Sequence, residues 1–320
     1  MRSGFLSKYF PPEKFLKPSY IGVSFSDFNI KAISFGKTPT DIFLKSIITP
    51  FEKGSVVAGS IVKMDDVVKK LSAIRKNFDS PFVFFTVPDE LTYLFSTSVL
   101  VTAGGNAMES VAFVIEENVP LSLSDTVFDF TPTKIIQSEL EYSASVVVAA
   151  CVKKEVEKFI EALRESGFEP IGCIHESQAI ANALIPKNFL GTACIIQARG
   201  NRIGIYLIKN NLVVFSTLRS VLDEDYSKQF LDEYEKFLDY CLKHDIDQNQ
   251  PIESVLVCGE FEYAKKIVEA IVGSENYTKD VKLPNVWANV FEIDKHLPDI
   301  PYEKSLSFAG SIGAALSDII

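Results

Sequence analysis

The 320-residue sequence contains no apolar run of the roughly 20 residues that a membrane-spanning helix needs. Its first residues also lack the continuous apolar stretch of an export signal. We therefore expect a cytoplasmic protein that is neither exported nor membrane-spanning.

Basic residues, cysteine pairs and histidine clusters are scarce as well. Lys and Arg number 32 against 42 Asp and Glu, a net charge of −10 that argues against nucleic acid as a partner. The 5 cysteines form no C-x-x-C pair, which is typical of a reducing compartment. The 3 histidines lack metal-ligand spacing, so we expect no metal site built from side chains.

What the sequence does have is enough hydrophobic residues, 47%, for two cores of ordinary domain size. Residues 1–18 combine basic and aromatic side chains around two prolines, and are either a loose tail or an arm that docks on a partner or an anionic membrane surface. We assign 19–87 and 172–190 to a first lobe. Its expected elements are a hairpin over 20–35, a helix capped by Asp65 and a buried strand over 82–87.

Residues 88–171 are predicted to form a small α+β domain inserted into the first lobe. A helix from Asn106, strands over 127–130 and 144–152, and a helix from Lys153 to Ser166 with Gly167 at its C′ position define it.

The second lobe is assigned to 191–305, and its opening hairpin resembles the first one. At a constant offset of 173 residues, Ser24 falls on Gln197 and Ser26 on Arg199, with apolar strand positions in phase. The turn at Asn210 and Asn211 tolerates positive φ. A closing helix over 306–320, rich in small residues, is expected to pack closely against a sheet of the first lobe.

Four stretches together resemble the type IV pilus assembly protein PilM family, from about Phe10 to the C-terminus. The most specific keeps the family's order of strand, helix, Gly and Glu-x-x-Ala over nearly forty positions. The four stretches are 11–31, 108–130, 146–184 and 308–316. The resemblance implies an α/β fold of two actin-like, ribonuclease H-like lobes around a cleft, with an SHS2-like domain inserted in the first lobe.

Actin-like folds hold ATP and Mg²⁺ with Gly-rich turns and strand carboxylates. By this resemblance the nucleotide-facing positions of the chain are Ser24, Ser26, Asp27, Lys31, Glu176, Gln197, Arg199, Gly200, Asn201, Gly259 and Glu260. Ser24 and Gln197 stand where the family has the Asp residues of its two phosphate turns, and Ser26 and Arg199 stand where it has Gly. Glu260 adds a negative charge, whereas Lys31 and Arg199 could contact phosphate directly.

These changes predict weak or no ATPase activity, and we assign no catalytic residue and no metal ligand. Glu176 either faces the cleft or is a helix-start carboxylate favoured by the helix dipole. Without the resemblance, the residues indicate only a two-lobed α/β protein with ordinary turns.

The resemblance implies a scaffold at the inner face of the cell membrane. Its partners would be the cytoplasmic N-terminal peptide of a PilN-like single-span membrane protein, held between the first lobe and the inserted domain, and the pilus motor ATPase. Three alternatives stay open: an active ATPase of the same fold that gates partner binding, an FtsA-like cell-division protein, and a sugar-kinase-like phosphotransferase. The last needs an Asp general base that no turn offers.

Overall fold

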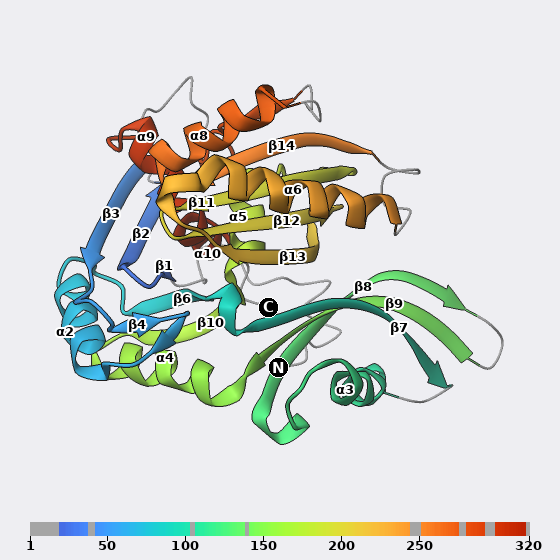
Figure 1. Ribbon diagram of the computed structural model, residues 1–320. Coiled ribbons are helices and arrows are strands. Elements are labelled where there is room, and N and C mark those ends of the chain that lie inside the picture. The colour runs from blue at the N-terminus through green and yellow to red at the C-terminus, as the bar shows by residue number, and fades with distance from the viewer. Residues whose placement is uncertain are drawn as a thin grey trace.

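The computed structural model describes residues 19–37, 42–102, 106–137, 141–243, 251–274, 280–291 and 298–317. Two five-stranded sheets form two lobes, and a three-stranded sheet forms a separate domain beside the first (Figure 1). The expected arm over 1–18, His244 and His296 lie outside the described residues.

The first lobe is built on a sheet whose strands run in the order β10-β6-β1-β2-β3. Strands β1 to β3 form an antiparallel meander, whereas β6 and β10 run parallel to β1. Strand β1 is buried along its whole length because both faces of the sheet are covered. The strand bounds are β1 (Ile21–Phe25), β2 (Asn29–Lys37), β3 (Ile42–Pro50), β6 (Phe82–Val87) and β10 (Glu169–His175).

The second lobe repeats this arrangement in the order β13-β12-β11-β14-β15. Val23 pairs with Ala32 between β1 and β2, and Ile196 pairs with Ile205, each 173 residues later, between β11 and β12. The shared strand order and register confirm the internal repeat. The strands are β11 (Thr192–Arg199), β12 (Arg202–Lys209), β13 (Leu212–Ser220), β14 (Ile252–Gly259) and β15 (Val281–Lys282).

Helices cover both sheets and also lie between them. Helices α2 (Met64–Arg75) and α4 (Lys153–Glu165) pack on the first sheet, and α6 (Tyr226–Lys243) and α8 (Phe261–Val272) pack on the second (Figure 1). Helices α5 (Glu176–Leu184) and α10 (Ala309–Leu316) share one apolar core between the lobes. Three short strands or helices complete this body: β4 (Val56–Val57), β5 (Ser60–Ile61) and α9 (Tyr302–Ser305). None of the helices in the described ranges combines the length and apolarity that crossing a membrane requires.

The close approach of α10 to its neighbours depends on glycine. A Cβ on Gly313 would lie 1.5 Å from the carbonyl oxygen of Ala179 in α5, and one on Gly22 in β1 would lie 2.0 Å from that of Ser311. Small residues at these positions bring α10 into backbone contact with both β1 and α5.

The inserted domain has the order β7-β9-β8 and is covered by one helix, α3. Its core of valines, alanines and Ile115 is separate from the core of the first lobe. The Asn106 side chain accepts a hydrogen bond from the N–H of Met108, which confirms the expected helix start. The elements are β7 (Thr92–Thr102), α3 (Ala107–Asn118), β8 (Thr126–Gln137) and β9 (Glu141–Val152).

The expected end of this domain at residue 171 is wrong, because α4 and β10 belong to the first lobe. Phe159 of α4 packs on Phe25 of β1 with ring centroids 4.8 Å apart, and β10 pairs with β6 from Glu169 onward. The inserted domain therefore covers 92–152.

The expected cap at Asp65 is also wrong, because α2 begins one residue earlier, at Met64. Its neighbour Asp66 instead binds the preceding loop, accepting hydrogen bonds from the Ser55 hydroxyl at 2.7 Å and the Glu52 N–H at 3.0 Å.

Candidate ligand-binding cleft

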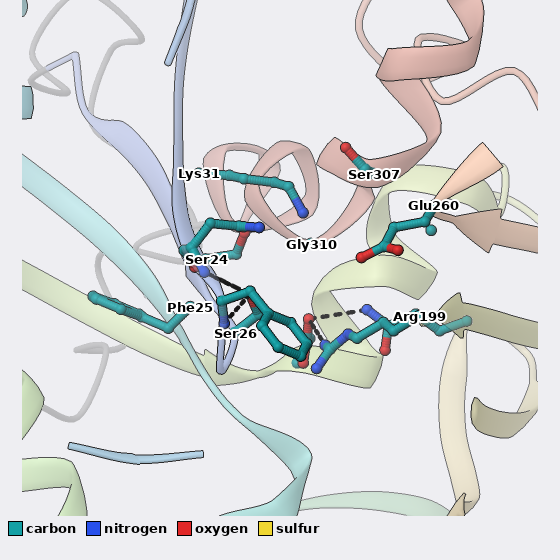
Figure 2. Close-up of a pocket in the computed structure, with 13 residues that line it drawn as sticks. Ser24, Phe25, Ser26, Lys31, Arg199, Glu260, Ser307 and Gly310 are labelled. Carbon is teal, nitrogen blue, oxygen red and sulfur yellow. Dashed lines mark hydrogen bonds and ion pairs between the residues drawn. The ribbon is translucent and has the colours of Figure 1, made fainter. Parts of the chain in front are cut away.

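A small cavity lies between the lobes, where the ends of β1 and β11 meet the start of α5. Its volume is about 20 Å³, enough for about one water molecule. Lys31 enters it from the first lobe, and Arg199 and Glu260 enter from the second (Figure 2). The predicted site residues that line it are Ser24, Ser26, Lys31, Glu176, Gln197, Arg199, Gly259 and Glu260.

Three other predicted residues lie outside this cavity. Asp27 turns toward the β4–β5 turn and accepts hydrogen bonds from the N–H of Gly59 at 2.9 Å and of Ala58 at 3.3 Å. Gly200 lies against the Tyr263 ring, and the Asn201 carbonyl accepts a hydrogen bond from the N–H of Val221. The structure therefore places these three residues outside the cavity, although Asp27 still meets the second lobe through its ion pair with Arg202.

Two arginines from the second lobe form ion pairs with three carboxylates of the first lobe and of α5. Arg199 pairs with Glu176, and its Nη1 lies 3.6 Å from Glu90 Oε1. Arg202 also pairs with Glu90, and its Nη2 lies 3.5 Å from Asp27 Oδ2. We call these five residues the interlobe ion cluster. All five side chains are between 6% and 17% exposed, so the charges are largely withdrawn from water.

Sequence reasoning missed Glu90 and Arg202, and it also missed the cavity-lining residues Phe25, Phe28, Asn29, Ser307 and Gly310. The signal available for Arg202 was its place opposite Arg199 across the second-lobe turn, where the two residues pair in register. For Glu90, which follows β6, the sequence gives no comparable signal.

Neutral side chains support the buried charges. The Gln197 amide donates a hydrogen bond to Glu176 Oε1 at 3.0 Å, and the Tyr206 hydroxyl donates one to Gln197 Oε1 at 2.8 Å. Burial alone would lower the pKa of Arg199, but the surrounding groups, the Glu176 carboxylate first among them, together raise it. Arg199 therefore stays a cation. Glu176 is both the first residue of α5 and a cleft residue, which unites the two roles expected for it.

Lys31 is the second cation of the cavity. Burial first, and then the charge of Arg199, lower the pKa of Lys31 to about 8. The Glu176 and Glu260 carboxylates oppose this shift. The cleft thus contains its own cations and anions in near balance.

The residues present do not fit ATP with Mg²⁺. Ser26 Oγ already accepts hydrogen bonds from the N–H groups of Phe28 at 3.3 Å and Asn29 at 3.1 Å, so the donors of the first turn are bonded within the chain. The Glu260 N–H is likewise bonded to the Ala198 carbonyl at 2.8 Å. A cavity of about 20 Å³ is also far below the roughly 300 Å³ of a small-molecule pocket.

Gly259, at the turn between β14 and α8, has a structural reason to be glycine. Gly259 has φ of 105°, and a Cβ there would lie 2.1 Å from the Ala198 carbonyl oxygen. Its presence is explained by the close pairing of β14 with β11, where Gly259 lies opposite Ala198, and does not require a nucleotide.

A larger, apolar groove lies between the inserted domain and the first lobe. Its volume is about 280 Å³. Strands β8 and β10 both contribute to it, and each is at the edge of its sheet among the described residues. The residues that line it are Val87, Leu94, Val127, Phe128, Asp129, Phe130, Thr131, Val147, Ala149, Cys151, Val156, Cys173, Ile174, His175, Gln178 and Leu212.

Buried hydrogen bonds fix the wall of this groove at the end of β10. The Ser177 hydroxyl donates a hydrogen bond to Asp89 Oδ1 at 3.0 Å, and the same Oγ lies 2.9 Å from His175 Nδ1. The groove wall is thereby tied to the turn that leads from β6 into the inserted domain.

The duplicated lobes, the cleft between them and the inserted domain define the actin-like class of α/β proteins. A family profile described as type IV pilus assembly protein PilM matches residues 22–257. The chain therefore belongs to the PilM family of type IV pilus assembly proteins.

A solved structure shares this fold over nearly its whole length. The chain is similar to one of a "PilM-PilN type IV pilus biogenesis complex", with a TM-score of 0.76, 15% identity and coverage of 93% of this chain and 98% of the other. It also matches the ethanolamine utilization protein EutJ from Carboxydothermus hydrogenoformans, with a TM-score of 0.49, 11% identity and coverage of 95% and 91%. For MreB 5 of Spiroplasma citri bound to AMPPNP, the TM-score is 0.47 and the identity 12%, with coverage of 94% of this chain and 95% of the other. A search of the curated proteins found no match to the chain.

Proposed function

We propose that this PilM-family protein is a non-catalytic scaffold that binds the cytoplasmic N-terminal peptide of a PilN-like membrane protein. The observation that carries the proposal is the apolar groove between the inserted domain and the first lobe. Membership of the PilM family supports it, and the solved structure of similar fold is a complex of PilM with PilN.

The groove is suited to an extended, apolar peptide. Side chains such as Val127, Phe130 and Ile174 offer apolar contact area. The edge strands β8 and β10 border the groove and can pair with the backbone of an added strand. A peptide of alternating apolar residues would use both features.

The interlobe cavity supports the non-catalytic part of the proposal. Catalysis of phosphoryl transfer depends on positioned phosphates and a metal ion. Here the two positions that hold Asp in the family are the neutral Ser24 and Gln197, and the Glu176 carboxylate beside them is paired with Arg199. An active ATPase that gates partner binding is therefore the less favoured function.

Binding to a membrane protein's cytoplasmic segment would place the chain at the inner face of the cell membrane. From there the scaffold would link the membrane protein to the pilus motor ATPase, a partner that follows from the family resemblance.

Peptide titration tests the groove. A fluorescent peptide covering the N-terminal segment of the PilN-like protein from the same organism should bind the full chain saturably. Ala149→Trp places a large ring on the groove floor, and affinity should fall at least about tenfold. The control is Leu190→Trp, at a residue 84% exposed and outside the groove, which should bind as the unchanged protein does. Equal loss in both variants, or no binding by the unchanged chain, would reject the proposal.

A further inference from the structure

Every ion pair of the interlobe ion cluster runs from one hairpin of the second lobe to the opposite side of the cleft. Arg199 and Arg202 flank the β11–β12 turn. Their partners follow three different strands of the first sheet: Asp27 follows β1, Glu90 follows β6, and Glu176 follows β10. A single turn thus contacts three strand ends.

The internal repeat shows what is unusual about this hairpin. Residue Ser26 is the counterpart of Arg199 at the 173-residue offset, and Asn29 is the counterpart of Arg202. The Ser26 hydroxyl makes its hydrogen bonds within its own turn, whereas Arg199 reaches across the cleft to Glu176. The two turns that face the cleft therefore have equivalent positions in their sheets, but the side chain of one bonds within its turn and that of the other bonds to the opposite lobe.

The lobes have another contact besides these charges. The apolar core around α5 and α10 joins them at the base of the cleft. Opening of the cleft would therefore leave the lobes joined at this core, and it would separate the arginines of the second lobe from their partners on the other side.

We propose that Arg199 and Arg202 hold the two lobes closed without a nucleotide, with the Arg199 guanidinium occupying the space between the two turns. The closed form is then a permanent property of the chain and is not a response to ATP. This inference goes beyond the scaffold function, because it concerns the lobes and not the peptide groove.

The energetics support a closing role once the charges are buried. Removing one partner of a buried ion pair leaves the other charge uncompensated, which is strongly destabilising, whereas removing both is often tolerated. Without the two arginines the closed form would bury the Asp27, Glu90 and Glu176 carboxylates without a cation, so their removal should favour opening of the cleft.

The test compares the variant Arg199→Met/Arg202→Met with the unchanged full chain. Small-angle scattering should show a larger radius of gyration, and amide exchange should be at least about tenfold faster in 89–91 and 197–204. The melting temperature should fall by about 5 to 10 °C. Arg219→Met, which removes an exposed arginine of the same sheet, is the matched control and should change none of these. Unchanged compactness and exchange in the double variant would overturn the inference.

Two further measurements cover a double variant that fails to fold. Glu176→Gln keeps the side-chain size and removes one charge, and faster exchange in 197–204 is expected for it as well. Adding millimolar MgATP to the unchanged chain should leave its melting temperature and radius of gyration the same. A rise in melting temperature or further compaction with MgATP would show that a nucleotide closes the lobes, and the inference would be wrong even if the peptide binds its groove.

Discussion

Lys31 places a positive charge in the cleft beside another cation, and the consequence can be measured as a pH dependence. The pKa of Lys31 is about 8 in the folded protein, against an ordinary value of 10.5. Below pH 8 both the folded and unfolded chains carry the charge, so the cost of burying it is fully present. Between pH 8 and 10.5 the unfolded chain binds more protons, and the free energy of unfolding therefore rises with pH.

We predict that Lys31→Met stabilises the protein at pH 7 by on the order of 2 kcal/mol, because the buried charge is removed. The advantage of Lys31→Met should shrink as the pH is raised from 8 toward 10.5. Urea unfolding of both proteins over this range measures the difference. Lys304→Met, at an exposed lysine, is the control. A difference that stays constant with pH would contradict the predicted cause.

At the scale of single residues, local chemistry was predictable and long-range pairing was not. The turn at Asn210 and Asn211 has positive φ at both residues, and Gly167 has φ of 85°, as their residue types indicate. Arg202 and Glu90 are 112 positions apart, and nothing in the sequence marks them as partners. Asp27 was expected at the nucleotide site by the family resemblance, but its hydrogen bonds to Ala58 and Gly59 and its ion pair with Arg202 depend on distant segments.

At the scale of elements, the packing of α10 on α5 gives a sharp prediction. Gly313→Ala would put a Cβ 1.5 Å from the Ala179 carbonyl oxygen, and both groups are held by backbone. We expect a loss of at least about 3 kcal/mol in the free energy of unfolding, measured by urea denaturation, because the helices must move apart.

Gly310→Ala in the same helix is the matched control. A Cβ at this position would lie 3.4 Å from its nearest neighbour, which is ordinary contact. Alanine is also a better helix former than glycine, so the change should fall within about 1 kcal/mol of the unchanged protein. An equal loss in the free energy of unfolding for Gly310→Ala and Gly313→Ala would mean that the close approach of α10 and α5 does not limit the packing.

The helices themselves were predictable, but their assignment to domains was not. The apolar stripe of α4 marks a helix with one buried face, and a stripe does not show what covers it. Phe159 packs on Phe25 and Phe85 of the first lobe, contacts that bridge more than 70 positions of sequence. The inserted unit was therefore extended past Val152, where its own core ends.

At the scale of the whole molecule, the two duplicated sheets depend on a common core, whereas the inserted domain does not. The two sheets share the core around α5 and α10, whereas the inserted domain has its own. Thr92 and Cys151, at its two boundaries, are neighbours in an antiparallel pair. Adjacent ends and a separate core are the features of a domain that can be removed without breaking the body that carries it.

We therefore predict that replacing 93–150 by a short Gly-Ser linker leaves a folded two-lobed protein that no longer binds the peptide. The lost contacts of Leu94 and the Ser96 hydrogen bond to Val214 should lower the melting temperature, with a single cooperative transition retained. Circular dichroism measures the fold, and titration with the fluorescent peptide measures binding. The groove would lose the wall formed by β8 and β9. A shortened chain that binds the peptide as tightly as the full chain would place the binding site on the lobes, whereas one that does not fold would show that the inserted domain is part of the body's core.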